Sequence, residues 1–370
     1  MTKKYIIVAD QNMAGIDGLF GDVADIIYSE GRSISNKLLR DADALLCRSI
    51  TQIDQSLLKN TKVKFIGTAT IGTDHMDIDW LESQQISWAN AAGCNAAAVA
   101  QYVLSGIAFW CKTKHHDIKR LKVGIVGAGN VGTELARCFD LLGIQYLLCD
   151  PPLELQGDKR PLVSFDEILK CDVISLHVPI TDKGRYPTKY LINQARLSQL
   201  ASSQLLINAS RGAVVDNQAL AKYLSDSESI TDSAAVILDV FEGEPDVPVE
   251  LIDKCLLGTP HIAGHTLEGK LRGSWMIFEA FCKAFEILSH RQESDLYPSK
   301  NSISLTDQNL AENLLAVYDI GSDANALRIN TDPVAIRFDQ LRKNASQLTD
   351  GTIRRDYSGW QFIGKYRLPL

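Results

Sequence analysis

Short apolar runs separated by polar or glycine-containing turns recur along the first 290 residues of the chain. This pattern, with amphipathic stretches between the runs, predicts parallel strands joined by crossover helices. In the first 90 residues the predicted strands are Tyr5–Ala9, Ala44–Cys47 and Lys64–Gly67. In a second series the predicted strands are Lys122–Val126, Tyr146–Cys149, Val173–Leu176, Leu205–Asn208 and Ala234–Leu238.

The helices are predicted between these runs, at Asn95–Trp110, Gly132–Leu142 and Asn217–Ser225. The first of them lies in the one stretch of the chain that resembles a membrane span, Ala91–Cys111. Polar residues interrupt that stretch, and its apolar character comes mostly from alanine, which favours a buried helix over a spanning one. We therefore expect no membrane association.

The composition of the chain changes after about residue 291. Ser, Asn and Asp become frequent from Ser294 to Asp307, which indicates a linker. Beyond it the pattern predicts a helix at Gln308–Tyr318 and strand-like segments. We expect an α/β protein with two Rossmann-like or flavodoxin-like lobes, a cleft between them, and a small α+β C-terminal domain. The expected division is 1–94 with 266–290 for a substrate-binding lid, 95–265 for a nucleotide-binding lobe, and 291–370 for the C-terminal domain.

Composition narrows the possible functions. The 370 residues carry 38 Lys and Arg against 45 Asp and Glu, a net charge of −7, which argues against binding to nucleic acid. The eight cysteines include no C-x-x-C pair, which indicates reduced thiols in a cytoplasmic protein and no metal site. The apolar run at the N-terminus is too short for a signal peptide.

The sharpest local motif is the segment Gly127-Ala128-Gly129-Asn130-Val131-Gly132, which follows a predicted strand and opens a helix. Gly127 allows a tight turn, Gly129 leaves room for a pyrophosphate, and Gly132 lets the helix pack against the strand. The helix N-terminus offers free N–H donors to phosphate oxygens. The motif predicts a dinucleotide site, against the alternative of incidental glycines in a turn.

Asp150 ends the next predicted strand. A carboxylate at that place accepts hydrogen bonds from the hydroxyls of the adenosine ribose and repels a 2′-phosphate. The cofactor is therefore predicted to be NAD and not NADP.

Three further segments follow later strands and would bring an Arg, a Glu and a His to the carboxyl edge of the sheet. They are Asn208-Ala209-Ser210-Arg211-Gly212, Asp239-Val240-Phe241-Glu242-Gly243-Glu244-Pro245 and Thr259-Pro260-His261-Ile262-Ala263-Gly264. Each has an ordinary structural explanation by itself, as a turn, a loop start or a capped loop. Their order behind a nucleotide loop favours a catalytic site.

With these motifs the chain resembles the D-isomer-specific 2-hydroxyacid dehydrogenase family over about residues 40–290. The resemblance also uses the segments Arg48-Ser49, Gly67–His75, Gly93-Cys94-Asn95, Leu148–Pro152, Arg211–Asn217 and Thr266–Lys270. The extra C-terminal region, including Phe338–Lys343, also resembles one branch of this family. The resemblance implies an NAD-dependent enzyme in which His261 is the acid–base group, Glu244 bonds to its other ring nitrogen, and Arg211 binds the substrate carboxylate. Histidine suits proton transfer near neutral pH, and arginine suits bidentate binding of a carboxylate.

The resemblance implies further contacts. Val178, Asp239 and Gly264 are expected to contact the cofactor, with Asp239 accepting a bond from the carboxamide, whereas His177 is interpreted as structural. Ser49, Thr70 and His265 are expected to contact substrate. At the position of His265, the branch of the family that this chain most resembles usually has Tyr. Arg48 is our candidate for the substrate phosphate; the alternative is a surface arginine after a strand.

The expected reaction is the oxidation of 4-phospho-D-erythronate to its 2-oxo acid, a step of pyridoxal 5′-phosphate biosynthesis. Two alternatives stay open: another D-2-hydroxy acid such as 3-phosphoglycerate, or a dinucleotide-binding corepressor or sensor without catalysis. The resemblance also implies a homodimer formed through residues 291–370, so deletion of that range is expected to give a monomer.

Overall fold

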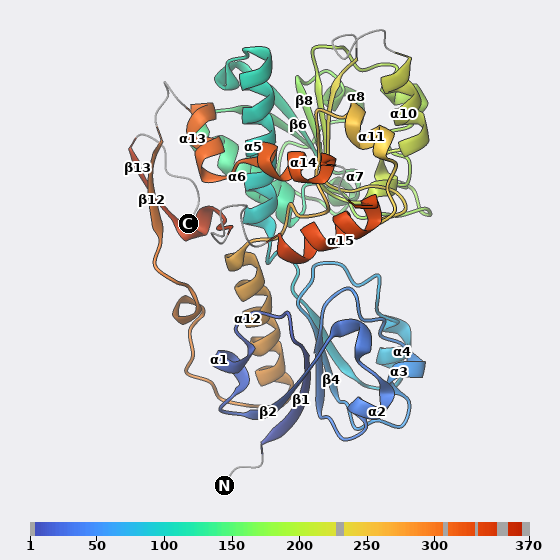
Figure 1. The fold of residues 1–370 in the computed structure, drawn as a ribbon, viewed down its shortest axis with the longest axis vertical. Helices are drawn as coiled ribbons and strands as arrows, with labels where there is room; N and C mark the ends of the chain where they lie inside the picture. The colour runs from blue at the N-terminus through green and yellow to red at the C-terminus, as the bar shows by residue number, and fades with distance from the viewer. Residues whose placement is uncertain (1–3, 227–232, 306–309, 330–331, 346–353, 365–370) are drawn as a thin grey trace. The chain divides into compact units, whose positions relative to one another are not determined.

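The structure is a computed structural model that describes residues 4–226, 233–305, 310–329, 332–345 and 354–364 (Figure 1). The chain divides into two compact units, one of Met1–Asn95 with Leu267–Ser299 and one of Ala96–Thr266 with Lys300–Leu370. Residues 291–299 thus group with the first unit and the remainder of the C-terminal range with the second. The assignment of residues 291–370 to a dimerisation domain remains a prediction, and parts of that range lie outside the described residues.

The first unit is built on a parallel sheet with the strand order β2-β1-β3-β4-β5. Its strands are β1 (Tyr5–Asp10), β2 (Ala24–Ser29), β3 (Ala44–Cys47), β4 (Phe65–Thr68) and β5 (Ser87–Asn90). This is the flavodoxin-like order, in which β1 and β3 flank the point where the direction of winding reverses. The three strands predicted in this region are confirmed, whereas β2 and β5 were not predicted as separate strands.

Helices of the first unit pack against this sheet, and aromatic side chains dominate the packing of the last of them. They are α1 (Ile16–Phe20), α2 (Asn36–Leu39), α3 (Gln55–Leu58), α4 (Ile78–Ser83) and α12 (Leu267–Ala284). Phe278 and Phe281 of α12 meet Phe20 edge-on, at ring-centroid distances of 5.1 and 5.4 Å. The chain therefore returns to its first unit after it has formed most of the second.

The second unit contains a parallel sheet with the strand order β11-β10-β9-β8-β6-β7. Its strands are β6 (Lys122–Val126), β7 (Gln145–Cys149), β8 (Val173–Leu176), β9 (Leu205–Asn208), β10 (Ala235–Leu238) and β11 (Leu257–Gly258). The predicted strands are confirmed, and β11 is an addition of two residues. The winding reverses between β6 and β8, so ligands are expected at the carboxyl ends of the strands near this point.

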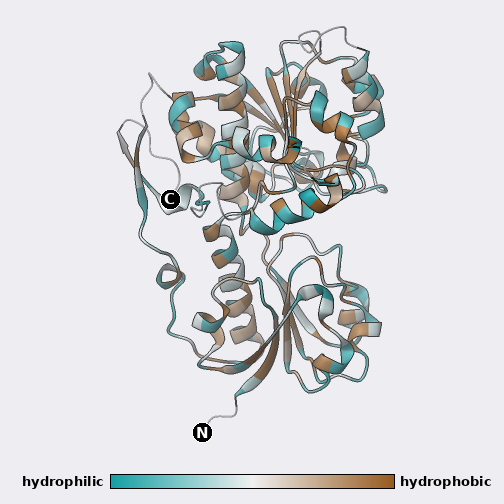
Figure 2. Cartoon of the chain, viewed as in Figure 1, coloured by the Kyte–Doolittle hydropathy of each residue, from teal (hydrophilic) through white to brown (hydrophobic). Residues whose placement is uncertain are grey.

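Seven helices within the described residues precede or connect these strands. They are α5 (Ala96–Lys114), α6 (Asn130–Leu142), α7 (Pro151–Leu155), α8 (Phe165–Ile168), α9 (Gln194–Leu197), α10 (Asn217–Ser225) and α11 (Val249–Lys254). α5 is buried along most of its length, as the alanine-rich pattern predicted. Apolar residues gather on the central strands of each sheet, whereas the helices alternate apolar and polar faces (Figure 2).

The C-terminal segment packs on the second unit. It contains β12 (Asn301–Leu305) and β13 (Trp360–Gly364), which pair in parallel, with α13 (Leu310–Val317), α14 (Ile320–Arg328) and α15 (Val334–Asn344). Leu314, Tyr318 and Tyr357 belong to the same hydrophobic core as α5, and α13 lies beside α5 in Figure 1. The segment is thus an integral part of that core. Among the described residues, every helix is too short or too polar to cross a membrane.

Candidate active site

The glycine loop lies between β6 and α6, and each of its three glycines meets a different requirement. Gly127 has a φ of 95°, and a Cβ there would lie 2.5 Å from the carbonyl oxygen of His177. A Cβ on Gly132 would lie 2.0 Å from the Gly127 oxygen. A Cβ on Gly129 would meet nothing within 4 Å, so the space beside this residue is open. The loop therefore has the form that a pyrophosphate site needs.

Asp150 supports this loop directly. Its Oδ2 accepts a hydrogen bond from the Ala128 N–H at 2.9 Å, and its Oδ1 accepts one from the Leu153 N–H at 3.1 Å. The second bond makes Asp150 the N-cap of α7. Each carboxylate oxygen can accept more than one bond, so a contact with the ribose, which remains a prediction, is compatible with both.

The end of β8 borders the same loop. The space next to Gly127 is closed by His177 and by Val178, whose Cγ1 would lie 3.1 Å from a Cβ on that glycine. His177 Nε2 lies 2.8 Å from the hydroxyl of Ser175, and burial lowers the pKa of His177 to about 3. A histidine that stays neutral and bonded in this way fits the structural role assigned to it.

Arg211 follows β9 on a turn shaped by Asn208. The Asn208 oxygen accepts bonds from the N–H and the hydroxyl of Ser210, and its Nδ2 donates to the Arg211 carbonyl. A Cβ on Gly212 would lie 2.0 Å from the Phe241 oxygen, so the turns after β9 and β10 touch. This contact sets the Arg211 turn beside the segment that carries Glu244.

His261 and Glu244 form a hydrogen-bonded pair, with His261 Nδ1 at 2.7 Å from Glu244 Oε2. Glu244 Oε1 accepts the Phe241 N–H at 2.8 Å. Burial would raise the pKa of Glu244, but the bonds from His261 and Phe241 and the charge of Arg342 outweigh burial and hold it below its usual range. The pairing leaves His261 Nε2 as the nitrogen that can exchange a proton with a bound molecule.

The backbone of His261 is in the left-handed region, with a φ of 56°. Such a conformation is uncommon for a residue other than glycine and persists where the surroundings fix it. The His261 N–H donates to the carbonyl oxygens of Asp239 and Thr259, at 2.7 and 3.0 Å. The ring is therefore held from both its backbone and its Nδ1 atom.

The Asp239 carboxylate anchors the loop that follows His261. Oδ1 accepts the Ile262 N–H at 2.8 Å and the Thr259 hydroxyl at 2.7 Å, and Oδ2 accepts the Ala263 N–H at 2.9 Å. Burial raises the pKa of Asp239, although His261 and these bonds oppose the shift. The structure thus gives Asp239 a positioning role, and its contact with a carboxamide remains a prediction.

The other side of the same loop is held by Arg354 of the C-terminal segment. Its Nη1 and Nη2 donate to the Ile262 and Ala263 carbonyl oxygens, at 2.6 and 3.2 Å. The guanidinium is buried and lies 3.8 Å from the centre of the Tyr318 ring. The peptide groups between His261 and Gly264 are thus fixed between a carboxylate and a guanidinium. This role of Arg354 was not predicted from the sequence.

Gly264 and His265 continue this loop and are both partly buried. The His265 N–H donates to the Ile262 carbonyl at 2.9 Å. The structure thus brings the two residues together with His261, Glu244 and Asp239 in the second unit.

The remaining predicted residues, Arg48, Ser49 and Thr70, belong to the first unit. Arg48 Nε donates to Asp10 Oδ2 at 2.9 Å, and its Nη2 lies 3.3 Å from Oδ1. The Asp10 side chain is completely buried. Arg48 is therefore oriented by Asp10 at the point between β1 and β3 where the winding reverses, and its contact with a substrate phosphate remains a prediction.

Lys270 is a second cation in this region, and no role was predicted for it. Burial lowers the pKa of Lys270, and the positive charge of Arg48 lowers it further. Thr70 donates its hydroxyl to the Gly72 carbonyl at 3.0 Å and lies 2.9 Å from the Thr68 hydroxyl. Ser49 is exposed.

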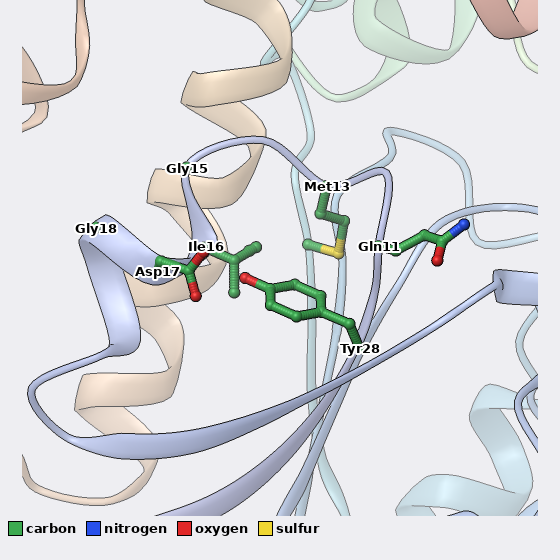
Figure 3. A pocket seen from close by; sticks show the side chains of 7 residues that line it. All are labelled: Gln11, Met13, Gly15, Ile16, Asp17, Gly18 and Tyr28. Carbon is green, nitrogen blue, oxygen red and sulfur yellow. The ribbon is translucent and has the colours of Figure 1, made fainter.

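A pocket of about 420 Å³ in the first unit contains none of the predicted residues. It is lined by Gln11, Met13, Gly15, Ile16, Asp17, Gly18 and Tyr28 (Figure 3). Burial and the bond to Asp17 raise the pKa of Tyr28 to about 12, and its hydroxyl points toward Asp17 in Figure 3. No group of metal-ligating side chains is found within the described ranges.

Comparison with known proteins relates this chain to one family of dehydrogenases. Residues 95–263 match the family described as D-isomer specific 2-hydroxyacid dehydrogenase, NAD binding domain. The chain is 41% identical to the erythronate-4-phosphate dehydrogenase of Marinobacter nauticus over 367 residues, which covers 95% of this chain and 93% of the relative. It is 42% identical to the enzyme of the same name from Shewanella amazonensis, with 91% of each chain covered.

Solved structures agree at the level of the fold. The NAD-bound 3-phosphoglycerate dehydrogenase of Entamoeba histolytica has a TM-score of 0.64 at 23% identity, over 77% of this chain and 96% of its own. The D-lactate dehydrogenase of Aquifex aeolicus, solved with NAD and lactic acid, has a TM-score of 0.60 at 23% identity, over 76% of this chain and 95% of its own. Both confirm the α/β fold with two lobes.

Proposed function

This chain belongs to the D-isomer-specific 2-hydroxyacid dehydrogenase family, and on that premise we propose that its substrate is 4-phospho-D-erythronate. The chain is an NAD-dependent dehydrogenase. The proposed product is (R)-3-hydroxy-2-oxo-4-phosphooxybutanoate, formed in the biosynthesis of pyridoxal 5′-phosphate. The observation that carries the catalytic assignment is the 2.7 Å bond between His261 and Glu244 on the unit that bears the glycine loop.

The residues of the second unit fit NAD. The open space beside Gly129, the left-handed turn at Gly127 and the start of α6 at Asn130 form a cradle for a pyrophosphate. The carboxylate of Asp150 stands beside this loop and disfavours a 2′-phosphate. Bound NAD supplies the acceptor for the hydride that leaves the substrate.

His261 acts as the base in the oxidation. Its Nε2 takes the proton of the C2 hydroxyl while the C2–H electron pair leaves as hydride, so that a C2=O bond forms. Glu244 at Nδ1 stabilises the imidazolium that results and fixes the ring. In the reverse direction the imidazolium returns the proton to the same oxygen.

Arg211 binds the substrate carboxylate and polarises the C2 oxygen as it becomes a carbonyl. Its planar guanidinium gives two parallel donors to a carboxylate, which a lysine cannot do. The turn after β9 that carries it touches the Phe241 carbonyl through Gly212. Arg211 and Glu244 are therefore presented by adjoining turns.

Arg48 and Lys270 are proposed to hold the substrate phosphate. Burial lowers the pKa of Lys270, and the positive charge of Arg48 adds to the shift, so a phosphate dianion beside both side chains would favour the charged lysine. Asp10 fixes the Nε edge of Arg48, so the guanidinium is already oriented before a ligand binds. Ser49 and Thr70 would add hydroxyl and backbone donors.

We also propose a cytoplasmic homodimer. All eight cysteines are buried thiols outside any disulfide, which fits a reducing compartment. Light scattering of the purified protein measures the mass of the assembly directly. A mass close to that of one 40.8 kDa chain would contradict the dimer.

The substrate is tested by measuring NADH formation with 4-phospho-D-erythronate, 3-phosphoglycerate and D-lactate under the same conditions. We expect the highest kcat/KM for 4-phospho-D-erythronate. A preference for 3-phosphoglycerate would contradict the proposed substrate and keep the family chemistry. Binding of NAD without turnover of any hydroxy acid would favour the corepressor or sensor.

A further inference from the structure

Helix α15 of the C-terminal segment is fixed rotationally against the second unit. Phe338 is fully buried and meets Phe241 edge-on, with ring centroids 6.4 Å apart. Arg337 is also buried, and its guanidinium donates to the Leu327 and Asp332 carbonyl oxygens, at 2.7 and 2.6 Å. Two neighbouring side chains thus set which face of α15 points to the unit.

Arg342 lies one helical turn after Phe338 and therefore on the same face. Glu244 follows Phe241 by three residues in the loop after β10. The helix and this loop therefore make two contacts in the same order along the chain: Phe338 packs on Phe241, and Arg342 lies beside Glu244. Arg342 Nη1 lies 4.0 Å from Glu244 Oε2. This is the oxygen that binds His261 Nδ1.

The separation of 4.0 Å is an ion pair and not a hydrogen bond. The Arg342 side chain is 30% exposed and that of Glu244 is 17% exposed, so solvent screens the pair only in part. A cation at this place favours the ionised carboxylate and opposes a second positive charge on the imidazole. The buried Asp239 acts on His261 in the opposite sense, since the two charges attract.

We propose that Arg342 is a positioning residue of the active site, which acts through Glu244 to set the pH range in which His261 exchanges its proton. The C-terminal segment is then part of the catalytic apparatus. This inference rests on the proposed function for its kinetic consequences. Arg342 keeps Glu244 ionised and aligned, and it favours the neutral imidazole that the oxidation requires.

The test compares Arg342→Ala, Arg342→Gln and Arg342→Lys with Lys343→Ala, which removes a neighbouring exposed cation from the same helix. Removal of the Arg342 charge lets the imidazole keep its proton to a higher pH. The acid limb of kcat/KM for oxidation and the basic limb for reduction of the 2-oxo acid should therefore both move upward, by roughly half a pH unit. Arg342→Lys should restore most of the shift, and Lys343→Ala should behave as the wild type.

A second measurement does not depend on turnover. In protein labelled with ¹³C-histidine, the His261 ring signal is assigned by its loss in His261→Asn and is followed against pH. We expect the midpoint of its titration to rise in Arg342→Ala and Arg342→Gln. Melting temperatures identify any variant that fails to fold, and the glutamine and lysine variants keep the helix and most of the side-chain volume.

The results separate the two proposals. A wild-type protein without activity on any hydroxy acid overturns the proposed function, while the His261 titration still decides the role of Arg342. An unchanged midpoint in both neutral variants overturns the role of Arg342. So does a rise in KM with both limbs unmoved, because that pattern belongs to a direct substrate contact.

Discussion

The loops after β6 and β7, which form the cofactor end of the second sheet, are built differently from the loops after β9, β10 and β11, which form its catalytic end. At the cofactor end one continuous segment supplies all three glycines. Gly127 has a φ of 95°, and a Cβ on Gly132 would approach the Gly127 oxygen to 2.0 Å, while His177 and Asp150 border the loop from the next two strands. At the catalytic end the loops after β9, β10 and β11 combine with Arg342 and Arg354 from the C-terminal segment. The glycine pattern of the nucleotide loop thus stands in one short segment, whereas the proton-transfer pair is held by residues from several loops and from the C-terminal segment.

The largest effect is expected at the catalytic end, from His261→Asn. Loss of the positioned base should lower kcat by roughly 10²- to 10⁴-fold. Asparagine tolerates the left-handed backbone, so the loop should keep its form. Calorimetric titration with NAD should show nearly wild-type affinity, and a comparable loss of NAD binding would show that the two ends are not separable.

The converse change is Gly132→Ala at the cofactor end. The added Cβ would lie 2.0 Å from the Gly127 oxygen, a backbone atom that cannot move aside cheaply. NAD affinity should fall by at least about tenfold, a loss of 1.4 kcal/mol or more, and the melting temperature should fall with it. Gly129→Ala is the matched control, since its Cβ meets nothing within 4 Å: it should keep the melting temperature and still weaken NAD.

Arg354→Met tests whether the C-terminal segment fixes the catalytic loop. The change leaves the Ile262 and Ala263 carbonyl oxygens buried without their donor, at a cost of about 1–3 kcal/mol for each unpaired group. Urea unfolding should show the loss of stability, and kcat should fall more than NAD affinity. Arg354→Lys keeps the charge but not the two-pronged contact, so full recovery in that variant would contradict the geometric explanation.

Asp150→Ser probes cofactor choice at the first end. Serine retains an N-cap for α7 but removes the charge that opposes a 2′-phosphate. The ratio of kcat/KM for NADP to that for NAD should rise by roughly tenfold. An unchanged ratio would show that Asp150 serves only the backbone bonds to Ala128 and Leu153.

The smallest effect concerns acid stability through Glu244. Its pKa lies below the usual range in the folded protein, so its ionised form contributes stability that is present above the pKa of the unfolded chain, about 4.3. That contribution is lost as the pH falls through the folded-state value. The difference in unfolding free energy between wild type and Glu244→Gln should therefore shrink below about pH 4, and a constant difference would contradict the sign.

Sequence patterns predicted most of the fold because buried parallel strands are continuous apolar runs. They missed β2 since it is an edge strand whose side chains are largely exposed, and they missed β11 because it has two residues. The pairing of His261 with Glu244 was available only through family resemblance. The roles of Arg342, Arg354 and Asp10 were not predicted, because each depends on a contact between residues 38 or more positions apart.

The path of the chain through the two cores also orders its biogenesis. The first unit needs Phe278 and Phe281 of α12 to cover its sheet, and the second needs Tyr357 and Phe362 beside α5. During synthesis on a ribosome, neither core is complete until long after its first strand has emerged, and the second core waits for Tyr357 and Phe362. Chains that stop before Tyr357 should therefore be recognised by chaperones and proteases as unfinished.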